Sequence, residues 1–76
     1  MNKDKRMTLN NILLQIDEIR RDVTSILSQE QSCLDNMPDN LEGTERYEKF
    51  ESSVENLEDA IESLKDAIKS IEEAMN

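Results

Sequence analysis

The sequence predicts an all-α fold in which two long helices form an antiparallel, coiled-coil-like hairpin. Apolar residues recur at alternating steps of three and four along both halves of the chain. This 3.5-residue period keeps one face of a helix toward a partner helix, whereas a strand requires a period of two. The only proline and the only glycine lie together between the two halves. A chain of 76 residues has room for a single domain, which we expect to cover residues 1–76.

The first helix is predicted over residues 7–36. Pro38 lacks an amide hydrogen and disfavours helical geometry at the residue before it, so the helix should end just short of this proline. A seam runs along this segment without a break in its spacing. Its members are apolar apart from one charged residue, Glu30. The predicted seam consists of Leu9, Ile12, Ile16, Ile19, Val23, Ile26, Glu30, Cys33 and Met37.

Residues 37–44 are predicted to reverse the chain. Pro38 can open one short helical turn with Asp39 in its first position, and Gly43 can close that turn in the left-handed conformation. Thr44 is the expected N-cap of the next helix, with Glu45 in the first turn. A connection this short makes the two helices antiparallel neighbours.

The second helix is predicted over residues 45–75, and its seam continues without interruption. The apolar alternation restarts after the turn and reaches the end of the chain. The predicted seam consists of Tyr47, Phe50, Val54, Leu57, Ile61, Leu64, Ile68, Ile71 and Met75.

Both helices have apolar faces wider than a two-stranded seam requires. The first helix carries Leu13, Arg20, Leu27 and Leu34 beside its seam, and the second carries Arg46, Ser53, Ala60, Ala67 and Ala74. Small residues allow another helix to approach closely. A lone hairpin buries so little apolar surface that the gain barely offsets the conformational entropy that the chain loses on folding. We therefore expect a homo-oligomer, most simply a dimer that forms a four-helix bundle.

The chain is acidic, with a net charge of −9 that is concentrated in its second half. Residues 1–36 hold five basic and six acidic side chains, whereas residues 45–76 hold four basic and ten acidic ones. Affinity for nucleic acid comes from lysine and arginine displacing counterions, so a nucleic-acid partner is not expected. The opposite role remains open, in which an acidic protein occupies a basic groove on a partner.

Nothing in the composition predicts catalysis or a cofactor. There is no histidine, which removes the usual general base and the commonest metal ligand. The single cysteine, Cys33, is interpreted as a small buried seam residue and excludes an internal disulfide. The charged first residues do not form a signal peptide, and no apolar stretch approaches the roughly 20 residues that span a bilayer. We expect a cytoplasmic protein without membrane contact.

Charged groups on the second helix suggest a binding surface. An acidic stripe recurs at steps of three or four and consists of Glu48, Glu51, Glu55, Glu58, Glu62 and Asp66. It flanks the seam and should face water, where it can remain a solvated face, repel wrong helix pairings or dock on a basic partner. A metal site is the weaker alternative, because carboxylate bundles use inward-pointing Glu-x-x-His motifs.

A few polar groups near the seam have more than one interpretation. Glu30 is expected to be exposed near the turn, to bind a ligand, or to fix the helix register by pairing with Arg46 or with Arg20 of another chain. Arg20, Arg21, Arg46 and Tyr47 are the groups suited to grip a phosphate or stack on a base, although solvation alone also explains the arginines.

Over nearly its whole length, the chain resembles small uncharacterised proteins encoded by phages and prophages of Gram-positive bacteria. In that family a helix is followed by a turn reading approximately Asn-Leu-Pro-Glu-Ser-Leu-Gln-x-Ser-Glu-Arg and then by an acidic helix with repeated Glu-Glu-Ala-Ile-like units. Here Met37, Asp39 and Thr44 replace Leu, Glu and Ser of the pattern. The segments that carry the resemblance are Glu30-Gln31, Asp35-Asn36-Met37-Pro38-Asp39-Asn40-Leu41, Thr44-Glu45-Arg46-Tyr47-Glu48 and Asn56-Leu57-Glu58-Asp59-Ala60-Ile61.

The resemblance implies a phage-encoded accessory protein that acts inside the bacterial host, and counter-defence is a role by analogy alone. Our leading hypothesis is a non-enzymatic protein that binds and blocks a host protein through the acidic helix or the turn. One alternative is an oligomeric sponge that traps a nucleotide signal with Arg20, Arg46 and Tyr47. Another is a structural coiled-coil component of a larger assembly.

Overall fold

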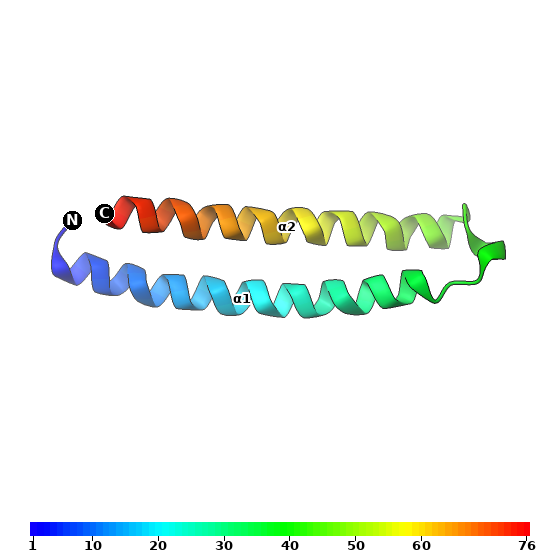
Figure 1. Cartoon of the computed structure of the whole chain (residues 1–76), viewed down its shortest axis with the longest axis horizontal. Helices are drawn as coiled ribbons and strands as arrows, with labels where there is room; N and C mark the ends of the chain where they lie inside the picture. The colour runs from blue at the N-terminus through cyan, green and yellow to red at the C-terminus, as the bar shows by residue number, and fades with distance from the viewer.

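The computed structural model describes residues 1–76 as two long helices in contact, without strands. Helix α1 spans Lys3–Asp35 and helix α2 spans Glu45–Met75, with the short 3₁₀ helix η1, Asp39–Leu41, between them. The helices run antiparallel and side by side, so that both termini lie at the end opposite the turn (Figure 1). The Cα extents are 59 × 15 × 13 Å. The predicted all-helical hairpin is confirmed.

Helix α1 begins at Lys3, four residues before the start that the apolar pattern predicts. The side chain of Asn2 accepts a hydrogen bond from the Lys5 backbone N–H at 2.8 Å. This N-cap satisfies one amide of the first turn and extends the helix through a charged segment that has no seam residue. Asp4 in the first turn complements the positive end of the helix dipole.

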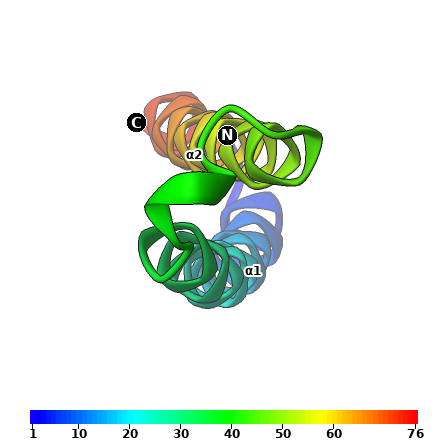
Figure 2. The same cartoon turned by 90° about the vertical axis from the view of Figure 1, so that its right-hand side faces the viewer.

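The turn follows the capping chemistry predicted from its residues. Pro38 precedes η1, and Gly43 has a φ of +82°, the left-handed region that glycine adopts without steric cost. Thr44 Oγ1 accepts a hydrogen bond from the Tyr47 backbone N–H at 3.3 Å and donates one to the Leu41 carbonyl at 2.6 Å. Figure 2, viewed from the turn end, shows the connection crossing from α1 to α2. Helix α2 then has the bounds that the sequence predicts.

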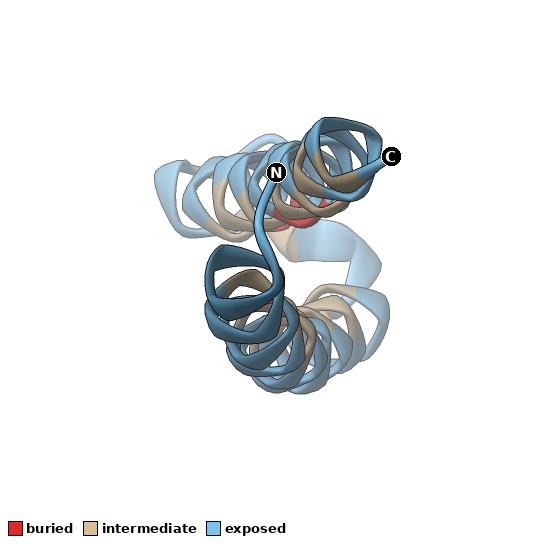
Figure 3. Cartoon of the chain, turned by 90° about the vertical axis from the view of Figure 1, so that its left-hand side faces the viewer, coloured by how far each residue is buried: buried red, intermediate tan, exposed pale blue.

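The core is one thin layer between the helices. Only Val54 and Ile61 are buried, with 6% and 8% of their surfaces exposed. The other seam residues of α2 are half-buried, and the less exposed residues of both helices face each other along the contact (Figure 3). The half-buried ridge of α1 continues into the turn at Met37 and consists of Leu9, Leu13, Ile16, Arg20, Val23, Leu27, Glu30, Leu34 and Met37.

This ridge of α1 differs from the predicted seam at every second position. Ile12, Ile19 and Ile26 remain 37%, 51% and 49% exposed, and Cys33 is also exposed, which corrects its interpretation as a buried residue. The residues that the sequence analysis placed beside the seam turn toward α2 instead. The two ridges share Leu9, Ile16, Val23, Glu30 and Met37 and have the same 3.5-residue period, so periodicity does not distinguish them.

Candidate protein-binding surface

The hairpin has two broad faces of opposite character, one on each side of the helix contact. In an antiparallel pair, residues that follow the seam positions of both helices lie on one side, and residues that precede them lie on the other. We define the polar face by Asn10, Asp17, Thr24 and Gln31 of α1 with Glu51, Glu58, Lys65 and Glu72 of α2. We define the apolar face by Ile12, Ile19, Ile26 and Cys33 of α1 with Ala60, Ala67 and Ala74 of α2.

A shallow groove of about 430 Å³ opens on the polar face. Within it, Gln31 Nε2 donates a hydrogen bond to Asp35 Oδ1 at 2.9 Å, and Glu58 approaches from α2. The polar atoms of its lining include hydroxyl and carboxylate oxygens, which suit the N–H groups of a lysine or arginine side chain. The groove is lined by Thr24, Leu27, Ser28, Gln31, Ser32, Asp35 and Glu58.

Sequence reasoning missed the contribution of α1 to this groove. Thr24 and Gln31 follow seam positions at a spacing of seven, and Ser28 and Asp35 lie one helical turn beyond them. That regular polar row is the signal by which they could have been found. Because Glu58 belongs to the predicted acidic stripe, the structure brings the stripe and this row to one surface.

The acidic stripe of α2 is exposed and carries no compensating ion pair. All six of its residues, from Glu48 to Asp66, are exposed. The ion pairs of the chain join Asp17 to Arg20 and Arg21, and Glu45 to Lys49, and none of them involves the stripe. At a rise of about 1.5 Å per residue, the stripe extends over roughly 27 Å of helix.

Asp17 forms ion pairs with two of the arginines that were candidates for phosphate binding. Its Oδ1 accepts hydrogen bonds from Arg20 Nε at 3.1 Å and Arg20 Nη2 at 2.9 Å, and Oδ2 lies 2.7 Å from Arg21 Nη2. The hydrogen bond from Arg20, with the charges of both arginines, holds the pKa of Asp17 below its usual value. Arg20 remains on the α1 ridge, half-buried with its charge paired.

The other predicted phosphate-binding groups lie at the turn end and are not gathered with Arg20. Arg46 lines a shallow pocket of about 310 Å³ together with Cys33 and Asn36 of the α1 end. At about 1.5 Å per residue along α1, Arg20 is roughly 20 Å away from that pocket. Partial burial, with the nearby carboxylates of Glu42, Glu51 and Asp35, raises the pKa of Tyr47 above its usual value.

Glu30 is half-buried on the α1 ridge and forms no ion pair within the chain. The predicted intramolecular pairing with Arg46 is therefore wrong, because Arg46 lies at the side of the contact in the turn pocket, whereas Glu30 lies on the ridge itself. Its predicted pairing with Arg20 of another chain requires a second copy and stays a prediction. The side chain is near enough to solvent for its carboxylate to keep some hydration.

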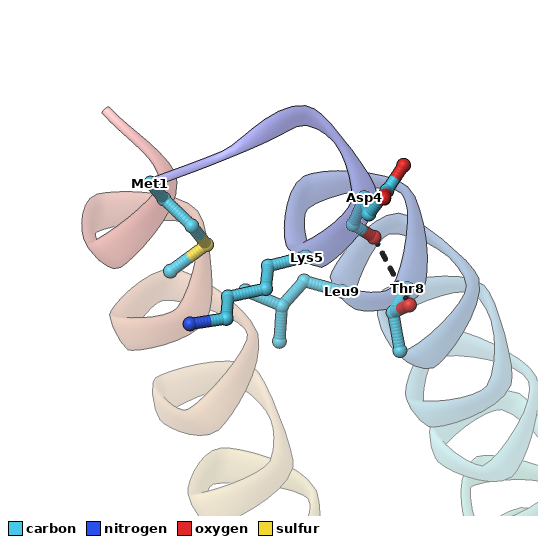
Figure 4. A pocket seen from close by; sticks show the side chains of 5 residues that line it. All are labelled: Met1, Asp4, Lys5, Thr8 and Leu9. Atoms are coloured by element: carbon cyan, nitrogen blue, oxygen red, sulfur yellow. Dashed lines mark hydrogen bonds between the residues drawn. The ribbon is translucent and has the colours of Figure 1, made fainter.

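A further pocket of about 350 Å³ lies at the end of the hairpin that holds both termini. Figure 4 shows Lys5 and Leu9 extending from α1 toward α2, with Met1 beside the end of α2. Thr8 Oγ1 donates a hydrogen bond to the Asp4 carbonyl at 3.1 Å, as the dashed line in Figure 4 marks. Met1 forms part of the wall of this pocket, and the pocket is open to solvent on one side. It lacks the convergent polar groups of a ligand site.

Neither helix combines the length and apolar character needed to cross a membrane. No group of three or more cysteine, aspartate and glutamate side chains is arranged to hold a metal ion. Comparisons of the chain with protein-family models, with curated proteins and with solved structures found no significant match. The interpretation of the surface therefore depends on its geometry and charge: a polar, acidic face and an apolar face on opposite sides of a thin two-helix core.

Proposed function

We propose that this chain is a non-enzymatic interaction protein that binds and blocks a host protein through its polar face and the adjoining acidic stripe of α2. The observation that carries the proposal is the acidic stripe of α2, which is exposed and unpaired along roughly 27 Å of helix. An excess of one charge on an exposed face accelerates association with a surface of the opposite charge. The expected partner surface is therefore rich in lysine and arginine.

The groove beside the stripe gives this surface a means of selection. Electrostatic attraction alone is relatively indiscriminate, whereas Asp35, which accepts a hydrogen bond from Gln31, and Glu58 offer carboxylate acceptors from both helices. A guanidinium group can bind two carboxylate oxygens at once, so an arginine of the partner is well suited to this groove. The partner would place one arginine in the groove and further cations along the stripe.

Self-association into a four-helix bundle is the second part of the proposal. Only two residues are buried in the single chain, and the apolar face opposite the groove has no intramolecular partner. A second copy would cover that face and leave the polar face of each hairpin accessible. The resemblance of residues 30–61 to small phage and prophage proteins supports a phage-encoded accessory role, with a bacterial protein as the target.

The polar face can be tested with variants of equal charge. The chain is immobilised, proteins are captured from a lysate of a Gram-positive bacterium, and the dissociation constant of the purified captured protein is measured. The dissociation constant is measured at about 0.1 M and about 1 M salt. The Debye length falls from about 10 Å to about 3 Å between these concentrations, so binding should weaken strongly. The double variant Glu55→Lys with Glu58→Lys should abolish binding.

The matched control is Glu18→Lys with Asp22→Lys, which makes the same change in net charge on exposed positions of α1, outside the stripe. This control should bind nearly as well as the native chain. If both double variants lose the same affinity for the partner, net charge alone explains the loss, and a specific surface is refuted. Binding that is indifferent to salt and to the substitutions in α2 would also refute the proposal. A thermal-shift screen with nucleotides is run in parallel, and a raised melting temperature there would favour the nucleotide sponge instead.

A further inference from the structure

The apolar face collects exposed isoleucines from one helix and alanines from the other. Ile12, Ile19 and Ile26 recur every seven residues on α1 and leave a third to a half of their surfaces in water. The alanines of α2 recur at the same spacing on the same side. Cys33 and Arg46 continue the two rows toward the turn at steps of seven, and they line one pocket at the turn end, so the two rows end on the same side of the hairpin. A row of small residues beside a row of large ones allows another helix pair to approach closely.

The dimensions of this face fit a dimer interface. With Cα extents of 59 Å along the helices and 15 Å across them, this whole side of the hairpin measures roughly 900 Å², so a second copy that overlapped it fully would approach the 800 Å² per partner of a standard stable interface. The opposite side exposes one large apolar residue, Leu14, but its rows also carry Asp17, Gln31, Glu58 and Glu72, which would be costly to cover in the same way. The apolar face is therefore the one that a second hairpin would cover.

Charge is distributed unequally along the hairpin, and this selects the orientation of the second copy. The turn half, residues 21–60, holds three basic and eleven acidic side chains, a net charge of −8. The half with the termini, residues 1–20 and 61–76, holds six basic and seven acidic ones, a net charge of −1. Two hairpins in the same orientation would place both strongly acidic halves side by side within screening distance. Opposite orientation pairs each acidic half with a nearly neutral one.

We propose that a second copy of this chain docks on the apolar face with its long axis reversed, so that the two-fold axis of the dimer passes near Ile19. This inference rests on the self-association proposed above and adds the face and the orientation. Reversal about Ile19 brings Ile12 of each copy opposite Ile26 of the other. The isoleucine rows of the two copies then interdigitate from Ile12 to Ile26, over about 21 Å, and both polar faces point outward.

The single native cysteine reports the orientation directly. Cys33 lies fourteen residues from Ile19, or about 21 Å along the helix, so two nitroxide labels on Cys33 should be about 40 Å apart in the reversed dimer. A dimer with both hairpins in the same orientation would bring them within about 20 Å. Light scattering of the labelled chain establishes that it is dimeric, and double electron-electron resonance then measures the distance. A distribution centred below about 20 Å would overturn the orientation.

A cross-linking pair provides a second measurement that does not depend on a label. In the variant Ile19→Cys with Cys33→Ser, the thiols lie beside the two-fold axis, so mild oxidation should produce a disulfide-linked dimer rapidly. The native chain, with its thiols far apart, should cross-link at least about tenfold more slowly under the same conditions. The reverse order of rates would contradict the proposal.

The face itself is tested by Ile19→Glu, with Leu14→Glu as the matched control. Both change one exposed apolar residue of α1 to a carboxylate, but Leu14 is 70% exposed and lies outside the apolar face. Ile19→Glu places two unpaired carboxylates in the interface and should weaken dimerisation by more than about a hundredfold. A dimer that tolerates Ile19→Glu as well as Leu14→Glu refutes the face. A native chain that remains monomeric at millimolar concentration refutes self-association, while binding of the polar face to a basic partner is measured separately and can still succeed.

Discussion

Truncating Ile61 should expose how much of the fold depends on its thin core. The side chain is only 8% exposed, and the change Ile61→Ala removes three carbon atoms from contact with α1. At about 0.8 kcal/mol for each buried methylene, with a small addition for the space left behind, we expect a loss of about 2–3 kcal/mol in the free energy of unfolding. The total free energy of unfolding of a domain of this size is only about 5–10 kcal/mol. A loss of about 2–3 kcal/mol should lower the melting temperature by roughly 10–20 °C.

The assay is urea and thermal unfolding followed by helix circular dichroism. Several protein concentrations are compared, because the stability of an associating chain depends on concentration. Leu14→Ala is the matched control: Leu14 is 70% exposed, so the same kind of truncation should change the free energy of unfolding by less than about 0.5 kcal/mol. If both variants lose the same stability at every concentration, α2 does not pack against α1 through Ile61, and the assignment of the core is refuted.

Three further predictions concern the turn and the Asp17 ion pairs. Gly43→Ala introduces a Cβ at a φ of +82°, where no atom lies within 4 Å, so backbone strain alone should lower the free energy of unfolding by about 1–2 kcal/mol in chemical denaturation. Thr44→Ala removes the side chain that caps α2 and should cost about 1 kcal/mol by thermal unfolding, whereas Thr44→Ser should retain most of the stability. The lowered pKa of Asp17 gives the folded state an advantage that is complete above the unfolded pKa of 3.8 and is lost as the pH falls through the lower folded pKa. Asp17→Asn should therefore flatten the acid limb of a stability profile in that range, and an unchanged acid limb would show that the ion pairs with Arg20 and Arg21 contribute nothing.

The acidic surface was accessible to sequence reasoning because charge and spacing define it within a single helix. Glu55 and Glu58 are exposed in the structure as their positions beside the seam predict. The groove was not accessible in the same way, because Gln31 and Glu58 belong to different helices. Their proximity depends on how α1 is rotated and shifted against α2, which no local pattern encodes. In the same rotation, Arg46 lies in the turn pocket without an ion pair to Glu30, and Cys33 is exposed to water.

By itself, the sequence determined the helical class, the reversal and the capping of α2. A 3.5-residue apolar period, one proline and one glycine leave the backbone few other solutions, because each acts through local geometry. The tertiary structure decided which of two adjacent ridges of α1 meets α2. Both ridges contain Leu9, Ile16 and Val23. They differ in which of two sets turns inward: Leu13, Arg20, Leu27 and Leu34 in the structure, or Ile12, Ile19, Ile26 and Cys33 in the predicted seam. That choice depends on contacts between residues far apart in the chain, and it gives the hairpin one polar and one apolar face.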